Sequence, residues 1–184
     1  PYQYVEIDLE KVFVQLLTDT KYGRETQNKP ADLKTFGQMV ATVFRVLSRE
    51  KLEAYQYTLA TLEELQNRGA RLFILSNAQR IFTQAEIELT GCATFMEKIY
   101  ISSDYRIKKP EPEFLLGLMG ENQLNPAETV FVGNDLTSDI AIAQAVGIDG
   151  VLLNTFPYSP DEIFAYQEKG WDFTIINDII ELIR

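Results

Sequence analysis

Four short apolar runs separated by longer helical segments constrain the fold of this chain more than any other feature. The runs are RLFILSN at 71–77, KIYIS at 98–102, TVFVG at 129–133 and GVLLN at 150–154. RLFILSN is nearly all apolar, which is typical of a parallel strand buried on both faces. Strands that alternate with helices in this way build a doubly wound sheet. The sequence therefore predicts an α/β fold with a parallel sheet.

The first part of the chain has a different pattern from the rest. Residues 1–53 contain two stretches with helical periodicity, from about 7 to 18 and after Asp32, and no convincing strand. Asp32 is suited to cap the second of these helices. From residue 54 onward, helices are expected near 54–67, 82–89, 112–119, 138–146 and 160–168. We therefore divide the chain into a helical region, 1–53, and an α/β core, 54–184.

Composition excludes several classes of function. The chain of 184 residues carries a net charge of -10, which disfavours a nucleic-acid partner. No apolar run approaches the roughly 20 residues of a membrane-spanning helix, so no membrane partner is expected and a cytoplasmic location is the default. The chain has no histidine and one cysteine, Cys92, which removes Ser-His-Asp and Cys-His catalytic sites. Any chemistry must use carboxylates, lysine, hydroxyls and amides. The oligomeric state cannot be read from the sequence.

Polar residues follow three of the predicted strands. Ser76-Asn77 follows the first, Lys109 lies in the loop DYRIKKPEPEF after the second, and the stretch GNDLTSD follows the third. Ligands of doubly wound sheets bind at the carboxyl ends of the strands. Hydroxyls, a lysine and clustered oxygen ligands at that edge are suited to hold a phosphate beside Mg²⁺.

Each of these residues also has a purely structural explanation. Ser76 would cap the following helix, Lys109 would be a solvated loop charge, and Asp135 with Asp139 would be turn and N-cap residues. The order of the three groups and their placement at strand ends favour a site over three separate coincidences.

The segments LFILSNA, IKKPEPEFL and VFVGNDLTSDIAIAQAVGI resemble motifs two, three and four of the haloacid dehalogenase (HAD) superfamily. The resemblance covers the chain from about residue 54 to its end. Residues 1–53 resemble, more loosely, the small helical cap that such proteins insert between their first and second motifs. The resemblance implies a HAD-like Rossmannoid parallel sheet with a small helical cap.

The resemblance also implies roles for the residues of motifs two and three. Ser76 would donate a hydrogen bond to a phosphoryl group, helped by the backbone N–H of Asn77. Lys109, rather than Lys108, matches the motif lysine because it directly precedes Pro110. It would neutralise the nucleophile and the transferred group.

The fourth motif departs from the family pattern. The family usually has Gly-Asp, whereas Gly133 here is followed by Asn134, and the carboxylate comes at Asp135. Whether Asn134, Asp135 or both bind the Mg²⁺ is therefore open, with Asp135 favoured for its charge. Asp139 would brace the loop or bind the metal through water.

The first motif of the superfamily, Asp-x-Asp on a central strand, is absent. Asp8 with Glu10, and Asp19 with Thr20, are the nearest candidates, but they fall in or at the end of a helical pattern. In the family fold this strand lies between those expected at 71–77 and 129–133, and without it the backbone groups of both would lack partners. We therefore expect a gap there, with the first central strand cleaved, disordered or supplied by another chain.

The leading functional hypothesis is a HAD-like, Mg²⁺-dependent phosphatase. It would act on a small phosphorylated metabolite through an aspartyl-phosphate whose Asp lies outside this chain, so the chain alone is expected to be inactive. The alternatives are a 2-haloacid dehalogenase-type hydrolase and a non-catalytic binding module with the same fold. The identity of the substrate is not readable from the sequence.

Overall fold

The computed structural model describes residues 2–19, 21, 25, 31–155 and 158–184. Its strands form two parallel sheets, one of order β1-β2 and one of order β3-β4-β5. The strands are β1 (Phe73–Ser76), β2 (Lys98–Ile101), β3 (Val130–Gly133), β4 (Asp149–Leu153) and β5 (Thr174–Ile176). The four strands expected from the apolar runs are therefore confirmed, and the fold is α/β with parallel sheets.

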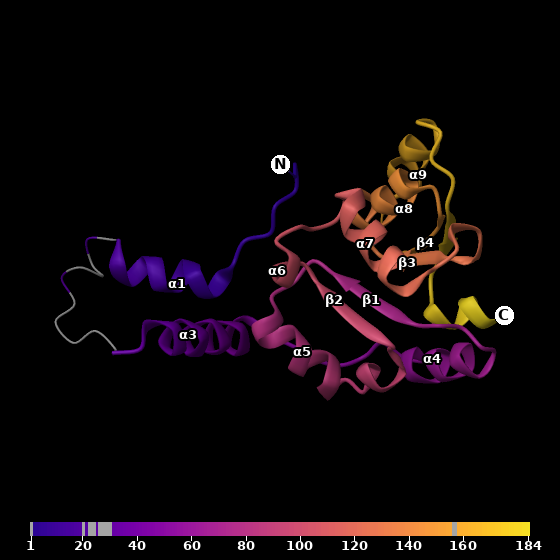
Figure 1. Ribbon diagram of the computed structural model, residues 1–184. Coiled ribbons are helices and arrows are strands. Elements are labelled where there is room, and N and C mark those ends of the chain that lie inside the picture. Colours follow the sequence, from indigo (N-terminus) through magenta and orange to yellow (C-terminus); the bar gives the residue numbers. More distant parts are fainter. Residues whose placement is uncertain (1, 20, 22–24, 26–30, 156–157) are drawn as a thin grey trace.

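Helices connect these strands and cover both of their faces. In Figure 1, α4 and α5 lie on one side of β1 and β2, and α7 lies on the other. The helices of this part are α4 (Thr58–Asn67), α5 (Arg80–Leu89), α6 (Ser102–Tyr105), α7 (Pro112–Asn122), α8 (Ala141–Val146) and α9 (Pro160–Gln167). Short turns complete it: 3₁₀ turns η1 (Cys92–Phe95), η2 (Pro126–Glu128) and η4 (Ile179–Ile183), and a π-helical turn η3 (Leu136–Ile140).

Two helices of the α/β part begin later than expected. The helix expected from 54 begins only at Thr58, because Tyr57 has a φ of 65° and this left-handed backbone interrupts a right-handed helix. The helix expected from 138 is preceded by the π-helical turn η3, which Asp135 caps. Both differences come from local backbone geometry that hydrophobic periodicity does not report.

The apolar faces of these elements bury two clusters. The first joins β1 and β2 to α7 and α8, and comprises Leu75, Tyr100, Ile107, Phe114, Leu115, Leu118, Met119, Ile142, Ala143 and Ile148. The second joins β4 to η3 and α9, and comprises Leu136, Ile140, Leu152, Ile163 and Phe173. The first cluster fixes α7 and the loop before it against the carboxyl end of β1, where the candidate site lies.

The sheets do not meet, since no pairing between β1 and β3 occurs in the described part of the chain. Val130 and Val132 of β3 are 52% and 38% exposed, although both are apolar residues of a parallel strand. The carbonyl of Leu75 in β1 accepts a hydrogen bond from the side chain of Lys109. This arrangement is consistent with the missing central strand that the sequence predicts.

The N-terminal region forms an antiparallel pair of helices, α1 (Leu9–Thr18) and α3 (Leu33–Ser48), that extends to one side of the sheets (Figure 1). Asp32 caps α3, as expected, and Asp8 caps α1 by accepting from the N–H of Lys11. Asp8 thus begins a helix and does not end a buried strand. For the other first-motif candidate, Asp19 follows α1, and Thr20 lies outside the described residues.

Glu86 on α5 binds two arginines, Arg45 within α3 and Arg49 directly after its last residue. Glu86 accepts hydrogen bonds from Arg45 Nε and Nη2 at 2.8 and 3.0 Å, and from Arg49 Nη1 at 2.9 Å. The Arg45 guanidinium also lies over the ring of Phe82. The hydrogen bonds from Arg45, followed by those from Arg49, lower the pKa of Glu86 despite the opposing effect of burial. This cluster connects the helical pair to the α/β part.

We expect Glu86→Gln to lower the free energy of unfolding by about 1–2 kcal/mol at pH 7, since it replaces charge-assisted hydrogen bonds with neutral ones. A carboxylate with a lowered folded-state pKa stabilises the protein fully above its ordinary value of 4.5, and this contribution is lost as pH falls through the folded value. The difference between wild type and variant in urea unfolding should therefore shrink below that pH.

The matched control is Glu64→Gln. Glu64 pairs with Arg68 on the exposed surface of α4, so its loss should change the free energy of unfolding by less than about 0.5 kcal/mol. Equal effects of the two variants would contradict a special role for Glu86.

Candidate active site

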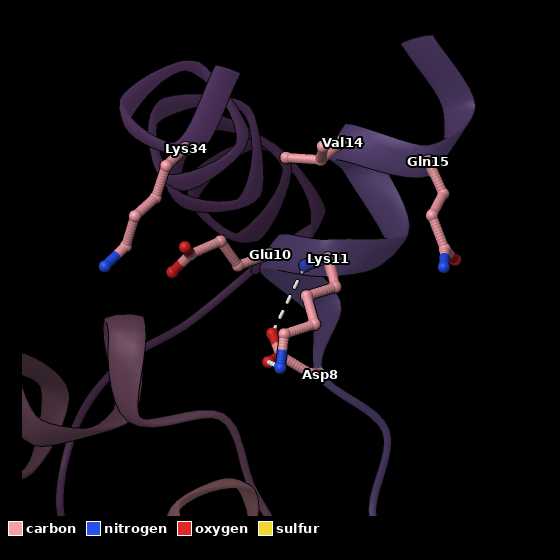
Figure 2. Close-up of a pocket in the computed structure, with 6 residues that line it drawn as sticks. All are labelled: Asp8, Glu10, Lys11, Val14, Gln15 and Lys34. Carbon is pink, nitrogen blue, oxygen red and sulfur yellow. Dashed lines mark hydrogen bonds and ion pairs between the residues drawn. The ribbon is translucent and has the colours of Figure 1, made fainter. Parts of the chain in front are cut away.

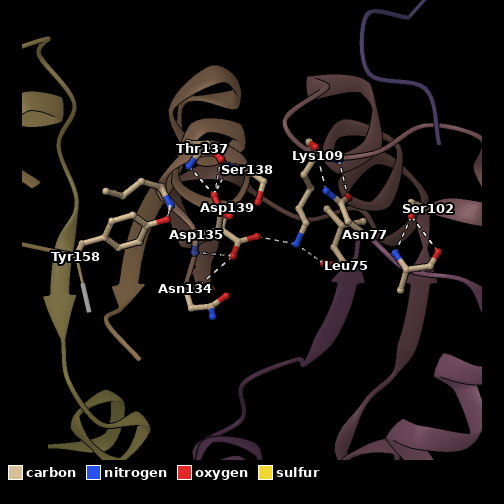
Figure 3. A network of polar contacts seen from close by, with 12 residues as sticks. Leu75, Asn77, Ser102, Lys109, Asn134, Asp135, Thr137, Ser138, Asp139 and Tyr158 are labelled. Carbon is tan, nitrogen blue, oxygen red and sulfur yellow. Dashed lines mark hydrogen bonds and ion pairs between the residues drawn. The ribbon is translucent and has the colours of Figure 1, made fainter. Parts of the chain in front are cut away.

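A buried ion pair joins the carboxyl ends of the two sheets. Lys109 Nζ donates to Asp139 Oδ1 at 2.6 Å and to the carbonyl of Leu75 at 2.9 Å (Figure 3). The side chains of Lys109 and Asp139 are 10% and 8% exposed. The same Nζ lies 5.4 Å from the centre of the Phe131 ring. The lysine of motif three is thus in contact with both β1 and the loop after β3, as strand-end placement predicts.

The second carboxylate oxygen of Asp139 organises the loop after β3. Asp139 Oδ2 accepts the backbone N–H groups of Asn134 and Asp135 at 2.9 and 3.1 Å. Gly133 leaves the space for this carboxylate, because a Cβ at that position would overlap the Asp139 side chain. Asp139 therefore braces the loop, which is one of the two roles considered for it from the sequence.

Asp135 caps the π-helical turn that follows. Its Oδ1 accepts from the N–H of Thr137 at 2.6 Å, from the Thr137 hydroxyl at 2.7 Å and from the N–H of Ser138 at 2.9 Å. Burial opposes ionisation of this carboxyl, but the hydrogen bonds from Thr137 and Ser138 outweigh it and lower the pKa of Asp135. The turn and N-cap role considered from the sequence is therefore present in the structure. Asp135 Oδ2 accepts no hydrogen bond from the residues that the structure describes.

Ser76 and Asn77 lie at the end of β1, and their side chains differ in their contacts. Ser76 is the last residue of the strand, and its hydroxyl has no hydrogen bond to any other described residue. Asn77 binds the main chain of Lys109 in both directions: its Nδ2 donates to the Lys109 carbonyl at 3.0 Å, and its Oδ1 accepts the Lys109 N–H at 2.8 Å. The structure thus brings Asn77, Lys109 and Asp139 together, with Ser76 beside them.

Sequence reasoning missed two groups of this edge. The first is the side-chain amide of Asn77, since the resemblance assigns a role only to the backbone N–H of this residue. The second is Ser102, which directly follows β2 and is fully buried. Its Oγ accepts the N–H of Ala78 at 2.8 Å and donates to Glu6 Oε2 at 2.6 Å. Ser102 could have been found by the strand-end rule that singled out Ser76.

Binding of Mg²⁺ at this site would need side-chain oxygens that do not already accept a hydrogen bond or form an ion pair. Both oxygens of Asp139 are engaged by Lys109 and the loop N–H groups, which leaves Asn134 Oδ1 and Asp135 Oδ2. Among the described residues, no group of three or more His, Cys, Asp or Glu could hold a metal ion. Mg²⁺ needs about six oxygen ligands, several of which are usually water or substrate. The described residues of this chain thus fit part of a magnesium site and not a whole one.

A separate pocket of about 590 Å³ lies beside the helical pair (Figure 2). The residues that line it are Asp8, Glu10, Lys11, Val14, Gln15 and Lys34. Two of its charges neutralise each other, because Lys11 Nζ lies 2.7 Å from Asp8 Oδ2. None of the motif residues at the strand ends lines this pocket.

Within the described residues, no helix is both long enough and apolar enough to cross a bilayer.

Comparison with known proteins agrees with the motifs and with the fold. The chain is 27% identical over 167 residues to a glyceraldehyde 3-phosphate phosphatase of Methanothermobacter thermautotrophicus, an alignment that covers 91% of this chain and 70% of that protein. It is 29% identical over 126 residues to a phosphoglycolate phosphatase of Salmonella typhi, covering 68% of this chain and 49% of that protein. This chain therefore spans only about half the length of some curated relatives.

Solved structures show the same fold. The crystal structure of a 2-haloacid dehalogenase from Pseudomonas syringae pv. Tomato superposes with a TM-score of 0.71 at 19% identity, covering 95% of this chain and 70% of that one. The family model of haloacid dehalogenase-like hydrolases matches residues 2–153. The matched residues include all three motifs. Lys109 of the third motif and Asp139 of the fourth form the buried ion pair described above. The chain therefore belongs to the haloacid dehalogenase-like hydrolases.

Proposed function

We propose that the protein containing this chain is a phosphohydrolase that removes a phosphoryl group from a small phosphorylated metabolite through an aspartyl-phosphate. The observation that carries the proposal is the buried Lys109 ammonium at the carboxyl ends of β1 and β3. A cation held in a desolvated place stabilises phosphoryl charge far better than one in water. The curated relatives that are named as phosphatases support the same reaction class.

Lys109 has the capacity for a further contact. An ammonium group has three donors, and two of them bind the carbonyl of Leu75 and Asp139. The third would point between the nucleophilic carboxylate and a phosphoryl oxygen, where the positive charge of the ammonium would reduce the repulsion between these two anionic groups. Asp139 and the Leu75 carbonyl keep the ammonium in place while this happens.

Ser76 would contribute a second donor. Ser76 is the last residue of β1, and its hydroxyl forms no hydrogen bond with another described residue. The hydroxyl is therefore available to donate to a phosphoryl oxygen. The backbone N–H of Asn77 would join it, as the family resemblance implies. A hydroxyl and a backbone N–H at a strand end form the usual kind of oxyanion stabilisation.

The nucleophile would come from outside the 184 residues. An aspartate at the end of a strand between β1 and β3 would face Lys109 and attack phosphorus. The bond from phosphorus to the substrate oxygen would break, and this oxygen would leave as an alcohol after taking a proton from the second carboxyl of the Asp-x-Asp motif. Water would then hydrolyse the aspartyl-phosphate and release phosphate. Asn134 and Asp135 would supply two of the ligands of Mg²⁺, which when bound would neutralise charge on the phosphoryl group. The helical pair α1/α3 would act as the cap over this site.

The test is phosphate release by the full-length protein from p-nitrophenyl phosphate, glyceraldehyde 3-phosphate and phosphoglycolate. Activity should disappear with a chelator and return with Mg²⁺. The 184-residue chain alone should be inactive, because it lacks the nucleophile. Activity that persists unchanged in excess chelator would contradict the magnesium dependence, and activity of the chain alone would contradict the external nucleophile.

A 2-haloacid dehalogenase-type reaction is the second candidate. A site without a metal ion would gain nothing from uncompensated charge at Asp135 and Asp139. Lys109 compensates Asp139, however, and three hydrogen bonds compensate Asp135, so these two charges do not argue against a metal-free reaction. Chloride release from 2-chloropropionate in the absence of Mg²⁺, without phosphate release from the phosphorylated substrates, would favour this candidate.

A further inference from the structure

The loop after β1 carries two side-chain amides, and each binds a different segment of main chain. Asn77 binds the N–H and C=O of Lys109 at 2.8 and 3.0 Å. Gln79 binds the segment that enters α1: its Nε2 donates to the Ile7 carbonyl at 2.9 Å, and its Oε1 accepts the Leu9 N–H at 3.0 Å. Between them, the N–H of Ala78 is fixed by the buried hydroxyl of Ser102. One short loop therefore contacts both the lysine segment and the helical pair.

The end of β1 contacts Lys109 twice, through the side chain of Asn77 and through the carbonyl of Leu75. Leu75 and Asn77 lie two positions apart at the end of β1. The Leu75 carbonyl accepts from Lys109 Nζ, and the Asn77 amide binds the main chain of the same lysine. Lys109 is thus attached to the end of β1 at both its backbone and its ammonium group. This double attachment removes the freedom of a flexible four-carbon side chain to direct its charge elsewhere.

We propose that Asn77 is a positioning residue whose side-chain amide fixes the main chain of Lys109, so that the ammonium group stays between the Leu75 carbonyl and Asp139. The consequence for catalysis rests on the proposed phosphohydrolase function, whereas the position of the lysine does not. Asn77 itself is exposed, and exposed hydrogen bonds contribute little to stability because water replaces them. The effect of Asn77 should therefore appear in the placement of Lys109 and not in the stability of the fold.

The first experiment measures the accessibility of Lys109 without using activity. The full-length protein, Asn77→Ala and Gln79→Ala are treated briefly with acetic anhydride, and acetylation of Lys109 relative to Lys108 is quantified by mass spectrometry. In wild type, Lys109 should react slowly because its side chain is only 10% exposed and carries an ion pair. Asn77→Ala should raise its relative acetylation several-fold. Gln79→Ala, which removes the other amide of the same loop, should leave the ratio unchanged.

The second experiment measures kinetics with Mg²⁺ and p-nitrophenyl phosphate. Asn77→Ala should lower kcat by about tenfold to a hundredfold, the effect expected of a misplaced charged group, with a much smaller change in KM. Asn77→Asp keeps the acceptor for the Lys109 N–H but loses the donor to its carbonyl, so its kcat and acetylation should fall between those of wild type and alanine. This variant also serves if Asn77→Ala does not fold.

The outcomes separate the two proposals. Unchanged acetylation of Lys109 in both Asn77 variants would overturn the positioning role, whatever the activity. An equal rise in Gln79→Ala would overturn it too, because the effect would then be a general loosening of the loop. If wild type releases no phosphate while acetylation rises only in the Asn77 variants, the proposed function fails and the positioning role stands.

Discussion

Lys109→Ala is expected to lower kcat for phosphate release by the full-length protein by about a thousandfold, the upper part of the range for removing one stabilising donor from a transition state. The structural reason is that Lys109 Nζ is the cation held between β1 and the loop after β3. The same change leaves the buried carboxylate of Asp139 without its counterion. Because two backbone N–H groups still bind that carboxylate, we expect the free energy of unfolding to fall by about 3 kcal/mol, the low end for a broken buried pair.

The neighbouring lysine provides the control. Lys108 contributes its main chain to the loop, donating to the carbonyl of Tyr4, and no hydrogen bond of its side chain to another described residue is present. Lys108→Ala should therefore leave kcat unchanged and alter the free energy of unfolding by less than about 0.5 kcal/mol. Steady-state kinetics and urea unfolding measure both quantities. Undiminished activity in Lys109→Ala, or equal losses in the two variants, would remove Lys109 from the mechanism.

Gly133→Ala is expected to have the second-largest effect, lowering the free energy of unfolding by about 3 kcal/mol or somewhat more. A Cβ at this position would overlap Cβ, Cγ and Oδ2 of Asp139. The aspartate cannot move away without losing Lys109 and the two loop N–H groups. Phosphate release should fall together with stability, because the same displacement frees the lysine.

A glycine of α7 separates this steric effect from the general effect of adding a methyl group. Gly117 is exposed, and a Cβ there would meet nothing within 4 Å. Alanine has the higher helix propensity, so Gly117→Ala should raise the free energy of unfolding by about 0.5–1 kcal/mol. Urea unfolding of both variants at pH 7 provides the comparison. A Gly133→Ala variant as stable as wild type would show that Asp139 relaxes without cost.

The placement of much of the candidate site could be predicted, because its residues follow strands that the sequence reveals. The apolar runs locate the strand ends, and Ser76, Lys109 and Asp139 are read from positions relative to them. The different roles of Asp135 and Asp139 could not be predicted from the sequence. The sequence favours Asp135 as the charged metal ligand, whereas in the structure its Oδ1 caps the turn η3, and Asp139 accepts the hydrogen bond from Lys109. The metal ligands themselves stay a prediction.

The sequence by itself determined that this chain forms parallel strands and helices, and that a lysine and carboxylates lie at one edge of the sheets. Those features follow from local periodicity and from the geometry of strand ends, which a short window of residues contains. Only the tertiary structure decided that Lys109 meets Asp139, 30 residues away, and that Asn77 binds the main chain of Lys109 from 32 residues away. Such contacts depend on how separate elements pack against one another and on the directions of individual side chains, and no local pattern contains that information.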